Sequence, residues 1–206
     1  MNPRALVFAA APVAALLVGV AVTPAQTDGI HRHTFSGRDP VFVRGDANVK
    51  AEVKDHSISD QALKSQPTSE HFQLVLDAGT GDSAYVLYGY DTPPAPVTPA
   101  LTASVWVKAT KPGVQLRARV VLPKEPDPAR PESPLTFLIV GTTYGRPRNW
   151  DKLTIENVPD LLSKHLPAVR AKAKRDVNTE GAYVDRLVLN MYTGPGPVDV
   201  WVDDLE

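Results

Sequence analysis

Five side chains on the polar positions of alternating segments have the chemistry to bind a sugar. Trp106 offers an indole ring, and the apolar C–H face of a sugar ring stacks on such a surface. Arg117 and Arg119 follow in the next segment, where a forked guanidinium group can donate hydrogen bonds to hydroxyls. Asn190 and Tyr192 share one face of a later segment. We therefore predict a carbohydrate-binding patch built from these residues.

The tryptophans also have a simpler interpretation. Both sheets of a sandwich can bury a face under loops or a helix, and buried tryptophan is common in such cores, so core packing is the favoured alternative for Trp106. Trp150 and Trp201 each fit a packing role at a strand end. The alternatives predict opposite effects of removing Trp106: loss of binding or loss of stability.

Two carboxylates at the end of the chain suit a hard cation. Asp203 and Asp204 follow a segment in which Val198, Val200 and Val202 alternate with polar residues. Carboxylate oxygens are ligands that calcium prefers, although a calcium site needs six or more oxygens. The alternative is a pair of solvated carboxylates at a sheet edge, where charge discourages aggregation.

Other chemistry is poorly supported by the sequence. His31 and His33 would share one strand face, but no third metal ligand accompanies them, so surface histidines are the favoured interpretation. The chain has no G-x-S-x-G elbow, P-loop or H-E-x-x-H motif. We therefore expect a protein that is not an enzyme.

The elements that position these residues are mostly short strands. Alternating or apolar segments predict strands over residues 31–35, 48–54, 71–77, 83–90, 101–108, 114–122, 135–140, 182–192 and 198–202. The intervening segments 55–69 and 123–134 are polar or rich in proline and are predicted to be loops, and segment 91–99, with four prolines, is predicted to be an extended connection. Many short strands without alternating helices favour an all-β, antiparallel sandwich.

One short helix is expected in a crossover before the last two strands. Asn157 can cap it, and Pro159 suits its first turn. Leu162 and Leu166 follow at helical spacing, and Pro167 is predicted to split the helix into two pieces.

The composition restricts the class of protein and its partners. The chain has 206 residues, and 22 basic against 23 acidic residues give a net charge of −1. No excess of one charge is available to attract nucleic acid or an anionic membrane. The absence of cysteine excludes disulfides and zinc–thiolate sites, and 20 prolines disfavour long helices.

The first 25 residues have the pattern of an export signal. Arg4 supplies a positive charge, residues 5–22 are uncharged, and small residues precede Gln26. We expect cleavage near Ala25, which leaves residues 26–206 as one secreted, periplasmic or cell-surface domain. The alternative is an uncleaved membrane anchor, which Pro12 disfavours.

Several segments, in their order along the chain, resemble carbohydrate-binding modules of the galactose-binding-like, jelly-roll type. They are LTASVWVKA (101–109), NWDKLTI (149–155) and the closing VWVDDLE (200–206). The segments RARVVLP (117–123), AYVDRLVLN (182–190) and YTGPG (192–196) are similar to an N-terminal module of large secreted bacterial proteins that also carry a barrel resembling glycoside hydrolases.

The resemblance implies a jelly-roll fold and a non-catalytic accessory role in polysaccharide processing, with a polysaccharide or oligosaccharide as partner. It also implies a structural calcium where the first and last strands meet, close to Asp203 and Asp204. In the larger proteins the chain continues beyond the position of Glu206, so we expect a missing C-terminal domain. The competing hypothesis is a structural domain that packs against a neighbouring domain and binds no sugar.

Overall fold

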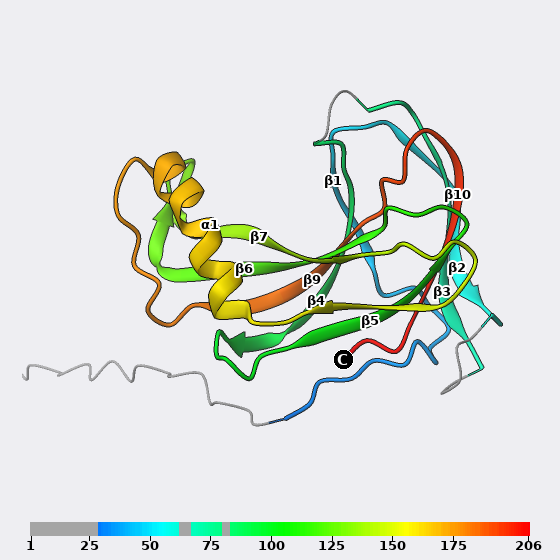
Figure 1. Cartoon of the computed structure of the whole chain (residues 1–206), viewed down its shortest axis with the longest axis horizontal. Coiled ribbons are helices and arrows are strands. Elements are labelled where there is room, and N and C mark those ends of the chain that lie inside the picture. The colour runs from blue at the N-terminus through cyan, green and yellow to red at the C-terminus, as the bar shows by residue number, and fades with distance from the viewer. Residues whose placement is uncertain (1–28, 62–66, 80–82) are drawn as a thin grey trace, which may run out of the picture.

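The computed structural model describes residues 29–61, 67–79 and 83–206, which form two five-stranded sheets and one helix (Figure 1). All strand pairs are antiparallel. Sheet 1 has the order β1-β4-β9-β6-β7, and its strands are β1 (Val43–Ala47), β4 (Val86–Pro96), β9 (Tyr183–Asn190), β6 (Gln115–Asp127) and β7 (Arg130–Thr143). Sheet 2 has the order β2-β3-β10-β5-β8, and its strands are β2 (Ala51–Ser59), β3 (Ser69–Leu76), β10 (Gly196–Asp203), β5 (Ala103–Ala109) and β8 (Asp151–Ile155). The expected antiparallel β-sandwich of jelly-roll type is confirmed.

Strand alternation places one apolar face of each sheet in a shared core. In β10, Val198, Val200 and Val202 are fully buried, whereas Asp199 and Trp201 between them are partly exposed. The same period of two holds in β5 and β6. Each fully buried valine contributes about 1.5–3 kcal/mol, so the alternation fixes which face of each strand points inward.

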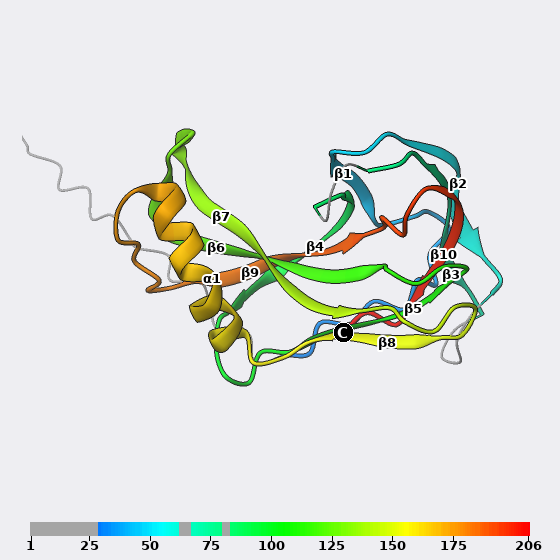
Figure 2. The same cartoon turned by 45° about the horizontal axis from the view of Figure 1, so that its top comes forward.

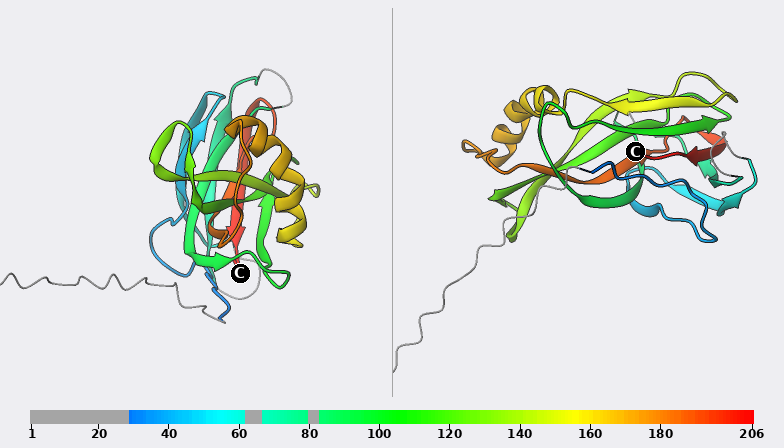
Figure 3. Two further views of the ribbon diagram at one scale, coloured as in Figure 1. Left: turned by 90° about the vertical axis from the view of Figure 1, so that its left-hand side faces the viewer. Right: turned by 90° about the horizontal axis from the view of Figure 1, so that it is seen from below.

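Sheet 1 is longer than sheet 2, and the helix covers the difference. The helix α1 (Val158–Ala173) packs against β7 at the end of the molecule where β6 and β7 extend past sheet 2 (Figure 2). Its residues Val158, Leu162 and Val169 are buried in the core. In the left view of Figure 3, α1 runs along one side of this end of the sandwich. The predicted single helix in the crossover is confirmed.

The predicted break at Pro167 is wrong, because α1 runs through this residue. Pro167 lies on the exposed side of the helix, so its ring meets no packed neighbour on the core side. Asn157 does occupy the N-cap, but its side chain makes no capping bond. Its carbonyl oxygen instead accepts hydrogen bonds from the amides of Asp160 and Leu161.

The predicted loop 123–134 is also wrong. Most of this segment belongs to the β6–β7 hairpin, in which Pro126 lies opposite Pro134 and Asp127 opposite Arg130. β9 accompanies β6 only as far as Val121, so the hairpin beyond this residue has free edges. Proline has no backbone N–H, and it is tolerated there because few amides have to donate hydrogen bonds to a neighbouring strand.

Several other boundaries differ from the prediction, and β1 and β8 are additional strands. β2 continues to Ser59, and β4 continues to Pro96 around an irregularity after Asp91. Residues 31–35 contain no regular strand; they make only an isolated bridge between His33 and Leu205. This bridge places the leading segment beside the last residues of the chain (Figure 3, right).

A buried carboxylate holds the segment before β1 against sheet 2. Glu70 of β3 is fully buried and accepts hydrogen bonds from the amides of Val41 and Phe42, each at 3.0 Å. Nε2 of His56 lies 2.7 Å from the same carboxylate. The three contacts compensate for the desolvation of this charge.

Candidate functional site

The structure separates the residues that the sequence predicts to act together. Trp106 lies in β5 of sheet 2, whereas Arg117 and Arg119 lie in β6 of sheet 1. All three alternate with buried residues, so they point away from the core on opposite outer faces of the sandwich. The reason is the connection between β5 and β6, which crosses from one sheet to the other. The predicted juxtaposition of tryptophan and arginines is therefore wrong.

The two arginines have partners within sheet 1. Arg119 donates two hydrogen bonds to the carboxylate of Asp185, at 2.7 and 2.8 Å, and this contact raises the pKa of Arg119. Arg117 donates from Nε to Gln115 at 2.9 Å, while burial lowers its pKa. The neighbouring Arg186 pairs with Asp91. The outer face of sheet 1 is thus a set of satisfied polar contacts.

Asn190 and Tyr192 bond to the backbone near the end of β9. The Asn190 side-chain oxygen accepts the amides of Val86, at 3.0 Å, and of Tyr192, at 3.2 Å, and this residue is buried. The Tyr192 hydroxyl accepts the amide of Gly79 at 2.8 Å. These contacts fix the loops around the strand end, so both side chains have a structural role.

A second tryptophan shares the outer face of sheet 2 with Trp106. Trp106 pairs with Asp203 of β10, which makes Trp201, two residues earlier, its diagonal neighbour across the β5–β10 pair. Both indoles are partly exposed. His71 of β3 stacks on Trp201 with 4.8 Å between ring centroids and 17° between planes. Nζ of Lys108 lies 5.1 Å from the centroid of the same ring.

We call Trp106, Trp201, His71 and Lys108 the tryptophan face. Sequence reasoning assigned Trp201 to packing and missed its place here. The signal was present, because Trp201 lies between Val200 and Val202 and must point to the opposite side of the strand.

Carboxylates fix the orientation of His71 within the tryptophan face. Its Nε2 lies 3.2 Å from Asp199, and its Nδ1 lies 3.4 Å from Asp55. A hydrogen bond from Ser57 is the main cause that lowers the pKa of Asp55, and His71 lowers it further. The stacked histidine and its carboxylates limit the movement of the Trp201 ring.

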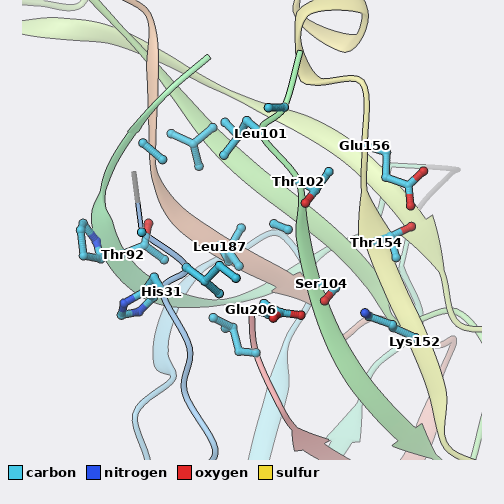
Figure 4. A pocket seen from close by; sticks show the side chains of 18 residues that line it. His31, Thr92, Leu101, Thr102, Ser104, Lys152, Thr154, Glu156, Leu187 and Glu206 are labelled. Carbon is cyan, nitrogen blue, oxygen red and sulfur yellow. The ribbon is translucent and has the colours of Figure 1, made fainter. Parts of the chain in front are cut away.

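A pocket of about 520 Å³ is lined in part by Ser104 and Lys152, which are neighbours of Trp106 in the sheet (Figure 4). The start of β5 and the strand β8 form one wall, and the end of β4 with the segment around His31 forms the other. Leu187 of β9 lines it from the core side. Lys152 pairs with Trp106 across β5 and β8, and Ser104 precedes Trp106 by two residues on the same face. The pocket is therefore continuous with the tryptophan face.

Asp203, one of the two predicted calcium ligands, is not a solvated carboxylate at a sheet edge. Asp203 belongs to β10, the central strand of sheet 2, and is fully buried. Its Oδ1 accepts the amide of Asp204 at 2.8 Å. Within residues 29–61, 67–79 and 83–206, no group of three or more histidine, aspartate or glutamate side chains is arranged to hold a metal ion. The calcium site stays a prediction.

The histidine pair of the leading segment makes local contacts. Nε2 of His31 lies 3.1 Å from the Tyr90 hydroxyl, and Nδ1 of His33 accepts the amide of Phe35. His31 is exposed, as the interpretation as a surface histidine expects, whereas His33 is partly buried. The predicted export signal lies outside the described residues. In the part of the chain that the structure describes, no helix is both long and apolar enough to span a membrane.

Comparisons with known proteins give similarities of fold. No protein-family model and no curated protein matches the chain. Among solved structures, the chain is similar to one described as a carbohydrate-binding module of the β-sandwich superfamily, with 11% identity and a TM-score of 0.46 over 83% of this chain and 60% of that one. It is also similar to a family 30 carbohydrate-binding module of a cellulosomal cellulase from Clostridium thermocellum, with 10% identity and a TM-score of 0.42 over 85% of this chain and 96% of that one.

A family 11 carbohydrate-binding module from a Clostridium thermocellum cellulosomal cellulase gives 12% identity and a TM-score of 0.37, over 87% of this chain and 90% of that one. The chain spans 60% of the length of the first of these structures. With TM-scores below 0.5, the similarities carry no argument about a ligand, and the geometry of the site has to carry it.

Proposed function

We propose that the tryptophan face binds the chain of a polysaccharide or oligosaccharide. The observation that carries the proposal is the pair of partly exposed indoles, Trp106 and Trp201, at diagonal positions on one sheet face. Exposed aromatic side chains cost free energy in water, and a sugar ring removes that cost at Trp106 by stacking its C–H face on the indole. Trp201, which lies between His71 and Lys108 in the strand register, offers the exposed part of its ring.

Polar groups around the two rings suit the hydroxyls of a sugar. Lys108 and Asp199 supply a donor and an acceptor beside Trp201, and Lys152 and Ser104 do so beside Trp106. The stacked His71 holds Trp201 in place, so less conformational entropy is lost on binding. A neutral glycan fits this mixture of charges better than a highly charged one.

The wider role is part of the same proposal. We propose a non-catalytic accessory domain that acts outside the cytoplasm, next to a further domain that processes the polysaccharide. A structural calcium near Asp203 and Asp204 is proposed as well, and the first experiment includes it. The competing role is a structural domain that packs its tryptophan face against a neighbouring domain.

A glycan array with matched variants tests the proposal. The wild-type domain, residues 27–206, is screened with calcium and again with chelator, beside Trp106→Ala, Trp201→Ala and Tyr183→Ala. Tyr183 is a partly exposed aromatic residue in β9 of sheet 1, so its variant controls for loss of any surface aromatic. We expect both tryptophan variants to lose binding and the tyrosine variant to keep it.

Two results would contradict the proposal. Absence of binding by the folded wild-type domain would favour the structural role. Unfolding of Trp106→Ala at a much lower temperature than wild type, with affinity per folded molecule unchanged, would show that the indole is a packing residue. Loss of binding on chelation would support the calcium site.

A further inference from the structure

The pocket beside Trp106 has two chemically different sides. Leu101 and Leu187 give an apolar lining, and Leu187 is almost fully buried. The hydroxyls of Thr102, Ser104 and Thr154 lie along β5 and β8, with Leu101 directly before Thr102, and Leu187 lines the pocket from β9 (Figure 4). A ligand that fits must therefore carry an apolar group next to a polar edge.

Two simple ligand classes each satisfy the pocket incompletely. An unsubstituted sugar can lay only the C–H face of its ring on the leucines, whereas an acyl group adds a methyl that buries further apolar surface there. A plain hydrocarbon would leave the hydroxyls of β5 and β8 without partners once water is displaced. A sugar in which an acyl group replaces or caps one hydroxyl satisfies both sides.

Charges at the rim restrict the substituent further. Lys152, Glu156 and Glu206 line the opening. None of the three forms an ion pair with another residue of the described ranges. One cation facing two carboxylates disfavours an anionic sugar. The substituent that fits is neutral, as an acetyl group is.

We infer that this pocket accepts an acetylated sugar residue of the glycan that the tryptophan face holds. The inference rests on the proposed function, because the pocket adjoins Trp106 through Ser104 and Lys152. The acetyl group lies against Leu101 and Leu187, and the hydroxyls of the same sugar bond to the β5 and β8 side. A volume of about 520 Å³ falls within the 300–1,000 Å³ range of small-ligand pockets, enough for one substituted ring.

Matched ligands that differ only in acetylation test this inference. Affinity is measured for acetylated xylan and acetylated glucomannan against their alkali-deacetylated forms, which covers O-acetyl groups. A chito-oligosaccharide is compared with a cello-oligosaccharide of equal length, because the second carries a hydroxyl where the first has an acetamido group. We expect at least tenfold tighter binding of the acetylated member in the pair that the domain recognises.

Pocket-filling variants show where the preference originates. Ala103→Leu in β5 and Ala100→Leu in the connection before it each place a larger side chain in the pocket and so reduce its free volume, and both positions are at least partly exposed. Each variant is expected to keep its affinity for the deacetylated ligand and to lose the preference for the acetylated one. Thermal unfolding confirms that each variant is folded, and the second variant remains informative if the first is unstable.

The outcomes separate the two proposals. Equal or weaker binding of every acetylated ligand, with binding to the tryptophan face intact, overturns the pocket assignment alone. A preference that persists in both filled variants also overturns it. Failure of the wild-type domain to bind any ligand of the panel and of the glycan array contradicts the proposed function and the pocket together.

Discussion

The two outer faces of the sandwich use their polar positions in opposite ways. On sheet 1, Arg119 is bound by Asp185 and Arg186 by Asp91, so each cation already has its anion. On sheet 2, by contrast, the outward positions of β5 and β10 carry Trp106 and a second partly exposed indole.

The difference shows what an alternating pattern can and cannot say. Alternation correctly identifies Trp106, Arg117 and Arg119 as outward side chains, whereas Asn190 is buried. It does not say whether an outward side chain already has a partner, because that partner comes from a strand that is distant in sequence. Arg119 and Asp185 are 66 residues apart, so only the strand register could join them.

The sharpest test of this comparison removes both indoles of the tryptophan face. Truncating one buried tryptophan at a binding hot spot costs about 2 kcal/mol, so Trp106→Ala with Trp201→Ala should cost about 4 kcal/mol. That is close to a thousandfold loss of affinity for the glycan identified on the array. Titration calorimetry measures the affinity, and denaturant unfolding should change much less because both residues are partly exposed. A double variant that binds as wild type would remove the distinction between the faces.

A second test asks whether the Asn190 side chain stabilises the fold or binds the glycan. Asn190→Ala leaves the amides of Val86 and Tyr192 without their acceptor in a buried environment. We expect a loss of about 2–3 kcal/mol in the free energy of unfolding, with glycan affinity unchanged. Urea denaturation and calorimetry on the same preparation measure the two quantities. A variant with native stability and weakened binding would restore the sequence prediction for this residue.

A third test concerns the ion pair of sheet 1. Arg119→Ala should lower the free energy of unfolding by about 1–2 kcal/mol, because Asp185 loses two charge-assisted hydrogen bonds. Both side chains keep some contact with solvent, which reduces the effect below that of a fully buried pair. A double-mutant cycle with Asp185→Asn isolates the coupling. Loss of glycan binding in Arg119→Ala would instead place a ligand on sheet 1.

The fold was largely predictable because its signals are local. Period-two alternation marked β5, the start of β6 and β10, and the residues after Asn157 marked the helix. The extension of β6 and β7 was missed because proline and charge are normally signs of a loop. Trp201 was missed for a different reason: the prediction gave it a packing role at a strand end and did not use its alternation with Val200.

The pH dependence of stability should be similar on the two faces, although the causes differ. The pKa of Asp55 is lowered chiefly by a hydrogen bond from Ser57, and that of Asp91 chiefly by Arg186. A lowered pKa means that each ionised carboxylate stabilises the fold above its usual value of 3.8, and that this stability is lost as the pH falls through the lower folded value.

Asparagine substitutions of Asp55 and Asp91 therefore test whether stability changes with pH in the same direction on both faces. Asp55→Asn and Asp91→Asn should each be less stable than wild type at pH 6, and the differences should shrink as the pH falls below about 4. Thermal unfolding over this range measures them. A difference that grows with acidity would contradict the assigned contacts. At neutral pH, Asp55→Asn should also weaken glycan binding slightly, because His71 loses one of the groups that orient it against Trp201.

The smallest expected effect belongs to Lys108. Its ammonium lies over Trp201 and also donates to Gln61 at 3.0 Å. An exposed cation–π contact contributes about 0.5–1 kcal/mol, so Lys108→Met should weaken glycan binding no more than about fivefold. Methionine keeps most of the aliphatic stem over the ring. Tryptophan fluorescence should therefore report an indole that is more accessible to solvent in a domain that is still folded. If Lys108→Met abolished binding, the main contact with the glycan would be the ammonium group and not the indole. The two faces would then differ in how their cations are paired and not in their exposed aromatic rings.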